Sequence, residues 1–266
     1  MNKKTDFLTL DEIENLPLHD TVVVATESAL DVVKNNLSFT IVKEVSDIPN
    51  GVKTVIVVGG GTLIDAVKID SLNKKYEVIA IPSIWGSGAE VSPIAVFLEN
   101  GEKRYIVDEK LKPRAVSRIP ALMDSIPDEL ARHGCGDAWS HVLEGGLSPL
   151  ANSEIRKESA ALIKRMSKIG IKKDERWFDM SAEACLVQAK SSVGMIHGIS
   201  HTLEAKLISE GESGEWGHAK ICTAFLWPVY TGFITGSEKW ERYLSDFDLD
   251  EEEISASIFS SFNREE

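Results

Sequence analysis

Two histidines, His197 and His201, lie four residues apart in a segment of small and apolar residues. On a helix, side chains four residues apart project from the same face, about one turn apart. Asp137 and His141 have the same spacing farther upstream, and His218 follows downstream. One carboxylate and several imidazoles are ligands that Fe(II) or Zn(II) accepts, with an open position left for a substrate. The spacing therefore indicates a metal site.

Two interpretations of these residues stay open at this point. A single histidine in a helix is usually a structural residue whose ring nitrogens are hydrogen-bonded within the fold. Two separate spacings of four, with a further histidine, favour a metal site made of Asp137, His141, His197 and His218. We expect His201 to stay outside the ligand set, where it can face the substrate and relay a proton near neutral pH. If His201 is instead a structural residue, we expect it to hydrogen-bond a metal ligand or a backbone carbonyl.

The composition is that of a globular chain with one large domain or two modest ones. It has 266 residues, 43% of them hydrophobic and 27% charged, and a net charge of −13. This charge argues against nucleic acid and anionic membranes as partners. The sequence has no apolar run of about 18 residues, so we expect no membrane-spanning helix. The 3 cysteines are widely spaced, so we expect no disulfide framework and a cytoplasmic location.

Apolar, β-branched runs alternate with helical patterns up to about residue 120. We expect a helix from Ser28 to Asn36, capped by the serine, strands at 21–26, 39–42, 54–58 and 77–82, and a hairpin of 94–98 with 103–107. A strand that is apolar throughout is typical of a parallel sheet covered on both faces. The pattern predicts an α/β domain over residues 1–120, with ligands at the carboxyl ends of its strands.

Longer helical patterns follow Pro120 and predict an all-helical domain over residues 121–266. The expected helices span 127–132, 136–145, 153–168, 181–195, 199–208 and 219–233. Every candidate metal ligand falls in this part of the chain. The acidic stretch 246–253 is expected to be a solvated loop followed by a helix start.

Three consecutive glycines, Gly59, Gly60 and Gly61, follow the most apolar predicted strand and precede a helical pattern. A strand, a glycine turn and a helix start present backbone N–H groups to a phosphate. The alternative is an ordinary turn with a glycine-rich tip, because the run matches neither the GxGxxG fingerprint nor a Walker loop. A second loop of small and hydroxyl-bearing residues, 83–90, follows the next predicted strand and could also face a phosphate.

Five segments, in the same order, resemble motifs of the iron-dependent alcohol dehydrogenases, whose wider superfamily includes glycerol dehydrogenase and dehydroquinate synthase. Residues 59–68 resemble the loop GGGSxxDxAK, and residues 81–91 resemble PTTxGTGSEV. Residues 136–144 resemble the helix DAxxHxxE and residues 197–201 resemble HGxxH. Residues 217–229 resemble the last histidine of the family with its following helix.

This resemblance implies an α/β, Rossmann-like nucleotide-binding domain followed by an all-α metal-binding domain. It implies Fe(II) or Zn(II) on Asp137, His141, His197 and His218, with His201 close to the substrate. It implies NAD or NADP bound by residues of the two loops and the hairpin: Gly59, Gly60, Gly61, Thr62, Asp65, Lys68, Ser83, Ser87 and Arg104. The implied reaction interconverts a small alcohol and its aldehyde or ketone. We also expect a homo-oligomer, a dimer, and Glu27 after the first strand would favour NAD through a ribose hydroxyl.

The chain departs from the family in several places. It is short, it shows no helix between the second and third predicted strands, and fewer than 40 residues follow Pro228. His201 and His218 lie 17 residues apart, and we expect residues 209–216 to form a polar loop over the site. Two alternatives to a dehydrogenase stay open. One is a cyclase or lyase like dehydroquinate synthase, which would need basic groups such as Arg132, Arg156 and Lys157, and the other is a non-catalytic, partner-dependent member of the family.

Overall fold

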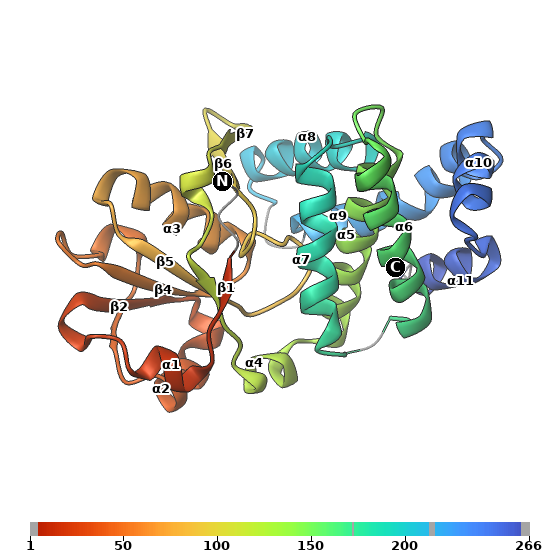
Figure 1. Ribbon diagram of the computed structural model, residues 1–266. Helices are drawn as coiled ribbons and strands as arrows, with labels where there is room; N and C mark the ends of the chain where they lie inside the picture. Colours follow the sequence, from red (N-terminus) through yellow and green to blue (C-terminus); the bar gives the residue numbers. More distant parts are fainter. Residues whose placement is uncertain (1–4, 172, 213–215, 262–266) are drawn as a thin grey trace. The chain divides into compact units, whose positions relative to one another are not determined.

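The computed structural model describes residues 5–171, 173–212 and 216–261 (Figure 1). It divides into two compact units. Unit 1 comprises residues 1–84, 88–97 and 104–126, and unit 2 comprises residues 85–87, 98–103 and 127–266. The α/β part precedes the helical part along the chain, which confirms the predicted fold class.

Unit 1 is built on a parallel sheet with the strand order β1-β8-β5-β4-β2-β3. Its strands are β1 (Asp6–Phe7), β2 (Thr21–Ala25), β3 (Thr40–Val42), β4 (Thr54–Gly59), β5 (Glu77–Pro82) and β8 (Ala115–Val116). The central strand β4 places Val55 opposite Val22 of β2 and Val78 of β5. Outside this sheet, β6 (Ile94–Glu99) pairs with β7 (Glu102–Val107) as the predicted hairpin. Asn100 and Gly101 both have positive φ there, as a type I′ turn requires.

Alternate strand residues fill two separate apolar cores, one on each face of this sheet. Val23 and Ile56 belong to the core covered by α1 (Leu10–Glu14), α2 (Leu30–Asn36) and α4 (Pro120–Ser125). Their neighbours Val22 and Val55 belong to the core covered by α3 (Gly61–Lys74), which Figure 1 shows on the side of the sheet opposite α1 and α2. Burial on both faces explains why these strands are apolar at every position.

The start of the predicted helix from Ser28 is wrong. A 3-10 turn (Glu27–Ala29) comes first and α2 begins at Leu30, with Ala29 as an N-cap that makes no side-chain bond. Ser28 lies inside the turn, so its hydroxyl cannot reach the first free N–H groups of the helix and instead lies 3.4 Å from the Thr26 hydroxyl. Between β3 and β4 the structure has only the 3-10 turn Val45–Asp47, as the sequence indicated.

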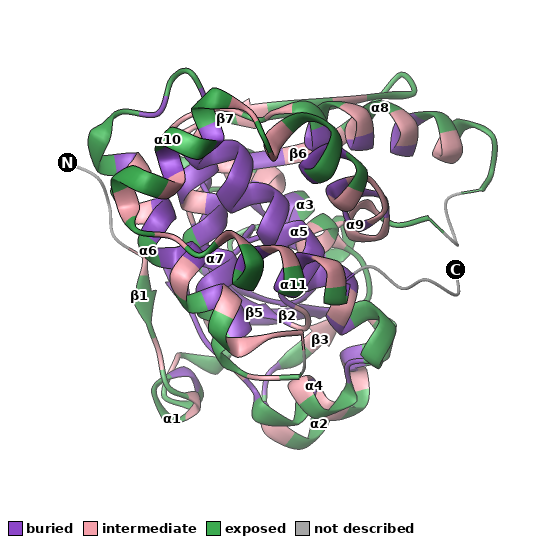
Figure 2. Ribbon diagram, turned by 90° about the vertical axis from the view of Figure 1, so that its right-hand side faces the viewer, coloured by how far each residue is buried: buried purple, intermediate pink, exposed green. Residues whose placement is uncertain are grey.

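Unit 2 is centred on the largely buried helix α5 (Asp128–Leu147), seen in the purple interior of Figure 2. Around it in sequence order are α6 (Ser153–Ile169), α7 (Arg176–Ala189), α8 (Met195–Ser209), α9 (His218–Val229), α10 (Glu238–Phe247) and α11 (Glu251–Ser261). A π-helical turn (Tyr230–Ile234) continues α9. Among the described residues, no helix is long and apolar enough to cross a membrane.

Two boundaries predicted for these helices are wrong. The helices expected at 127–132 and 136–145 are one continuous helix, because glycines that would weaken an exposed helix are here close-packing positions. The helix expected at 181–195 ends at Ala189, and the next begins at Met195, so that one helix carries both His197 and His201. The polar loop predicted over the site includes residues 213–215, which lie outside the described residues.

Gly136 allows α9 to approach α5. A Cβ at this position would lie 2.8 Å from the Thr223 Cβ, closer than side chains pack. We expect Gly136→Ala to lower the free energy of unfolding by about 1–3 kcal/mol through overpacking. Gly198 is a matched control, because it is exposed on α8 and a Cβ there meets nothing within 4 Å. Gly198→Ala should raise the free energy of unfolding by about 0.5–1 kcal/mol, and urea titrations of both variants test the pair.

Candidate metal site and glycine loop

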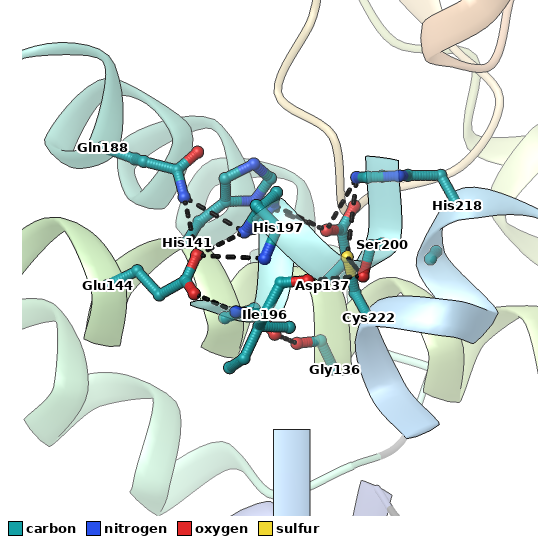
Figure 3. Close-up of polar contacts among 12 residues, drawn as sticks. Gly136, Asp137, His141, Glu144, Gln188, Ile196, His197, Ser200, His218 and Cys222 are labelled. Carbon is teal, nitrogen blue, oxygen red and sulfur yellow. Dashed lines mark hydrogen bonds and ion pairs between the residues drawn. The ribbon is translucent and has the colours of Figure 1, made fainter. Parts of the chain in front are cut away.

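In unit 2, the three predicted histidine ligands surround one carboxylate oxygen of the fourth predicted ligand, Asp137 (Figure 3). Asp137 and His141 lie on α5, His197 on α8 and His218 on α9. The Asp137 Oδ1 lies 3.5 Å from His197 Nε2, 3.9 Å from His218 Nε2 and 3.8 Å from His141 Nδ1. The helical spacing read from the sequence thus brings together residues from three helices.

The atoms that face one another in this cluster lack hydrogen bonds. Asp137 Oδ1, His141 Nδ1 and His197 Nε2 are buried and have no hydrogen-bond partner among the described residues. Leaving such atoms unsatisfied costs about 1–3 kcal/mol each, and native structures rarely tolerate it. A divalent cation among them would satisfy all three, so the donor set fits a transition metal.

The opposite ring nitrogens of two histidines are held by carboxylates. His197 Nδ1 lies 2.6 Å from Glu144 Oε2 and 3.1 Å from Gln188 Nε2. Glu144 also accepts a 2.5 Å hydrogen bond from the backbone N–H of Ile196, which fixes it to the start of α8. His218 Nδ1 lies 3.0 Å from Glu204 Oε2, and Glu204 is paired in turn with Lys103 at 3.0 Å. These contacts aim both Nε2 atoms at Asp137, as carboxylates behind metal-binding histidines do.

The histidines of the cluster differ in their protonation at neutral pH. Burial alone would lower the pKa of His197, but its contacts with Asp137 and Glu144 raise it to about 9. Burial lowers the pKa of His141 to about 3, which the nearby Asp137 only partly offsets. Burial would raise the pKa of Asp137, yet the surrounding His141, His197 and His218 hold it well below its usual range. At neutral pH His141 is therefore in the neutral form that binds metals, whereas His197 must lose a proton first.

His201 lies beside this cluster. Its ring stacks on that of His218, with centroids 4.8 Å apart, and its centroid lies 6.0 Å from that of His197. Burial, then the neighbouring His218, lowers the pKa of His201 to about 3, which keeps the imidazole neutral. Its Nδ1 has no hydrogen-bond partner among the described residues. The assignment of His201 as a proton carrier stays a prediction.

The cluster contains residues that sequence reasoning did not assign to the site. Cys222 follows His218 by four positions on α9, and its buried Sγ lies 3.5 Å from His218 Nε2. Glu144 and Glu204 each follow a histidine of the cluster, His141 or His201, by three positions. Residues three or four positions apart on a helix lie on the same face, so these spacings link all three residues to the histidines of this region.

The glycine run in unit 1 frames a cavity. Gly59 ends β4 and Gly61 begins α3, with Gly60 as its N-cap. The cavity, of about 400 Å³, is lined by Thr26, Gly60, Gly61, Thr62, Leu63 and Ala66. It lies at the carboxyl edge of the sheet and at a helix N-terminus, where backbone N–H groups favour an anion. Ser83 lies next to this turn, because its N–H donates to the Gly59 carbonyl at 3.0 Å.

The other predicted cofactor residues do not line this cavity. The Lys68 ammonium is fully buried and donates to Asp65 Oδ1, to the Ala89 carbonyl and to the Ile94 carbonyl, which uses its three protons. Asp65 also accepts from the N–H of Val96. Lys68 and Asp65 therefore tie α3 to the end of the second loop and to the segment that follows it. Arg104 is exposed on β7, whereas Ser87 belongs to unit 2.

Glu144 is expected to act on the metal site through His197. Its replacement by glutamine keeps the size but removes the charge that orients the imidazole and supports its Nε2 as a ligand. We expect Glu144→Gln to lower metal affinity roughly 10–100-fold, measured by competition with a chelating dye. Glu183→Gln, on the exposed surface of α7, is a matched control that should bind metal like the unmodified protein. Equal affinities of the two variants would contradict the positioning role.

The chain thus combines an α/β unit, with a glycine turn at its strand ends, and a largely helical unit that contains an Asp–His cluster. Residues 18–117 match the family described as iron-containing alcohol dehydrogenase. The aldehyde-alcohol dehydrogenase of Streptococcus pneumoniae serotype 4 is 28% identical over 151 residues, which is 53% of this chain and 17% of that protein. Over this α/β part, the chain is similar to the iron-containing alcohol dehydrogenase family.

Solved structures share the fold. The iron-containing alcohol dehydrogenase from Corynebacterium glutamicum superposes with a TM-score of 0.75 at 19% identity, covering 98% of this chain and 82% of that one. The sulfoacetaldehyde reductase from Bifidobacterium kashiwanohense, solved in complex with NAD+, gives 0.70 at 16% identity, covering 97% and 84%. In sequence, the matched segment spans only 17% to 49% of the curated aldehyde-alcohol dehydrogenases and maleylacetate reductases.

Proposed function

We propose that this protein is a metal-dependent, NAD(P)-linked oxidoreductase that interconverts a small alcohol and its aldehyde or ketone. The observation that carries the proposal is the convergence of His141, His197 and His218 on Asp137, with buried atoms that a bound cation would satisfy. Fe(II) and Zn(II) both suit these ligands, and the family favours iron. When bound, such a metal would act as a Lewis acid on the oxygen of the substrate.

The chain's own residues supply the remaining functions. Asp137 and the imidazoles would hold the metal, while Glu144 and Glu204 orient the imidazoles of His197 and His218. The N-terminus of α3, with Gly60, Gly61 and Thr62, would bind the diphosphate of the dinucleotide through backbone N–H groups. Glu27 follows Thr26, which lines the same cavity, and would accept a hydrogen bond from a ribose hydroxyl, favouring NAD over NADP.

His201 is the residue we propose to exchange the proton with solvent. Its ring stacks on that of His218 and is only partly buried, so it lies between the cluster and solvent, where a proton relay would act. We expect His201→Ala to lower kcat by about 100-fold or more without loss of bound metal. Thr202→Ala, exposed at the next position, is the control. Loss of metal from the His201→Ala protein would instead place His201 among the ligands.

Two of the basic residues named for the cyclase alternative, Arg156 and Lys157, lie elsewhere in unit 2. Arg156 and Lys157 line a cavity of about 610 Å³ together with Gly146. Gly146 follows Asp137 by nine positions on α5, which at about 100° per residue puts it on the opposite face of the helix. These two cations are therefore not placed to hold a phosphosugar beside the metal cluster.

The purified full chain, loaded with Fe(II) or Zn(II), tests the proposal. We expect one metal per chain by elemental analysis, NAD(H) or NADP(H) binding by calorimetry, and a change in reduced-nicotinamide absorbance with small alcohols or aldehydes. Stoichiometric metal and dinucleotide with turnover of a phosphosugar and no net redox would favour the cyclase. Absence of both metal and dinucleotide would favour the non-catalytic alternative. Light scattering of the same sample would test the expected dimer.

A further inference from the structure

We propose that Cys222 is a ligand of the metal, so that the site in this chain is a mixed Asp–His–Cys site suited to Zn(II). The inference rests on the proposed metal-dependent function and concerns which atoms hold the metal. The spacing of His218 and Cys222, four positions apart on α9, places both side chains on one face of that helix. Figure 3 shows the Cys222 sulfur beside Asp137 and between α8 and α9.

The geometry around Cys222 is that of a closed ligand set. One ligand atom each from Asp137, His197, His218 and Cys222 lies within 4.8 Å of every other. Cys222 is fully buried, and its Sγ lies 3.5 Å from His218 Nε2. Tetrahedral Zn(II), with bonds of about 2.3 Å to sulfur and about 2.0–2.1 Å to nitrogen, would separate those two atoms by about 3.6 Å. The observed separation therefore already matches shared coordination.

The unsatisfied atoms of the cluster point to a cation at the same place. Asp137 and His197 belong to the closed set. Asp137 Oδ1 and His197 Nε2 are buried and have no hydrogen-bond partner among the described residues. The remaining ring nitrogen of His197 is bound by Glu144, and that of His218 by Glu204. Each histidine of the set thus presents a single nitrogen toward Asp137 and Cys222.

Cys222 also has a purely structural interpretation. Its thiol lies 3.3 Å from the Ser200 hydroxyl, which itself donates to the Ile196 carbonyl at 2.7 Å. A neutral thiol that donates to Ser200 would be an inert packing residue. This interpretation leaves Asp137 Oδ1 and His197 Nε2 with only their 3.5 Å ion pair, whereas coordination would satisfy both atoms and the sulfur together.

Cys222 bears on the choice of metal. The closed set contains Cys222 rather than His141, whose Nδ1 approaches Asp137 Oδ1 at 3.8 Å from the side of α5. A set of one carboxylate and several imidazoles suits Fe(II) as well as Zn(II), but a thiolate is a softer ligand that shifts the preference toward Zn(II). A chain similar to a family described by its iron would then hold a site adapted to zinc.

Cobalt substitution tests the proposal with a readout other than activity. The metal-free full chain is titrated with Co(II), whose visible bands report binding and whose near-ultraviolet charge-transfer band reports a thiolate ligand. We expect both bands in the unmodified protein and in Cys185→Ser, another buried cysteine. Cys222→Ser should keep the visible bands, lose the charge-transfer band, and bind Zn(II) more weakly by at least the roughly 10–100-fold seen for residues behind the ligands.

The possible results distinguish failure of the proposed ligand from failure of the proposed function. Stoichiometric Co(II) with visible bands but no charge-transfer band in the unmodified protein overturns Cys222 as a ligand and leaves the proposed function standing. A charge-transfer band without oxidoreductase activity supports the ligand and counts against the function. No bound Co(II) at all overturns both. If Cys222→Ser fails to fold, the variant with both Cys135 and Cys185 replaced by serine must keep the band, because Cys222 is then the only remaining cysteine.

Discussion

Asp137→Asn is expected to leave the protein folded but unable to retain a metal. The Asp137 carboxylate is the point on which the imidazoles of His141, His197 and His218 converge, at 3.5–3.9 Å. Asparagine keeps the shape of this side chain but removes the negative charge and leaves a weakly coordinating amide oxygen. We expect metal affinity to fall by more than about 100-fold, beyond the loss caused by changing residues behind the ligands. Elemental analysis after dialysis against a chelator measures the loss.

The control for this prediction is Asp128→Asn. Asp128 lies on the same helix, in its first turn, and its exposed carboxylate pairs with Lys173 at 3.2 Å. A surface ion pair contributes little to stability, about 0–1 kcal/mol, so this variant should bind metal like the unmodified protein. Circular dichroism of both variants separates loss of the ligand from loss of the fold. Full metal content in a folded Asp137→Asn protein would show that the carboxylate is not a ligand.

The sequence was sufficient to predict elements whose residues obey one simple period. Strands β2, β4 and β5 were predicted almost to the residue, because burial on both faces makes each position apolar. Strands β1 and β8, with two residues each, carry too little sequence for any period to appear. That α5 is one continuous helix was not predicted either, because the residues packed against its glycines come from distant parts of the chain.

In the candidate site too, spacing within one helix was predictable from the sequence and contacts between distant residues were not. Helical spacing pointed to the site because Asp137 and His141, and likewise His197 and His201, lie one turn apart on single helices, and His218 was added as a further histidine. It could not show that Lys68 would be buried with its three protons used by Asp65 and two carbonyls, because Ala89 and Ile94 lie more than 20 residues away. It could not place Cys222 either, since its neighbours Asp137 and Ser200 come from two other helices.

Metal affinity is expected to rise with pH until about pH 9. The contacts of His197 with Asp137 and Glu144 raise its pKa to about 9, so this imidazole carries a proton at neutral pH that a metal must displace. Loss of that proton makes affinity about tenfold stronger for each pH unit between 6.5 and 9. His141, with its pKa lowered to about 3, is already neutral and adds nothing in this window. Competition titrations in Cys222→Ser, which removes the proton of the thiol, isolate the contribution of His197.

Stability of the metal-free protein should change in the opposite direction over the same pH range. The pKa of His197 is higher in the folded chain than the value of 6.5 for a free side chain. Its stabilising contribution is therefore fully present below pH 6.5 and is lost as the pH rises through about 9, and from the shift it is on the order of 3 kcal/mol. Thermal unfolding from pH 6.5 to 9 should then show Tm falling without metal, while the increment from saturating Zn(II) grows. Glu144→Gln removes one of the carboxylates that raise the pKa, so both trends should move to lower pH. A pH-independent affinity in Cys222→Ser would mean that His197 carries no proton for the metal to displace.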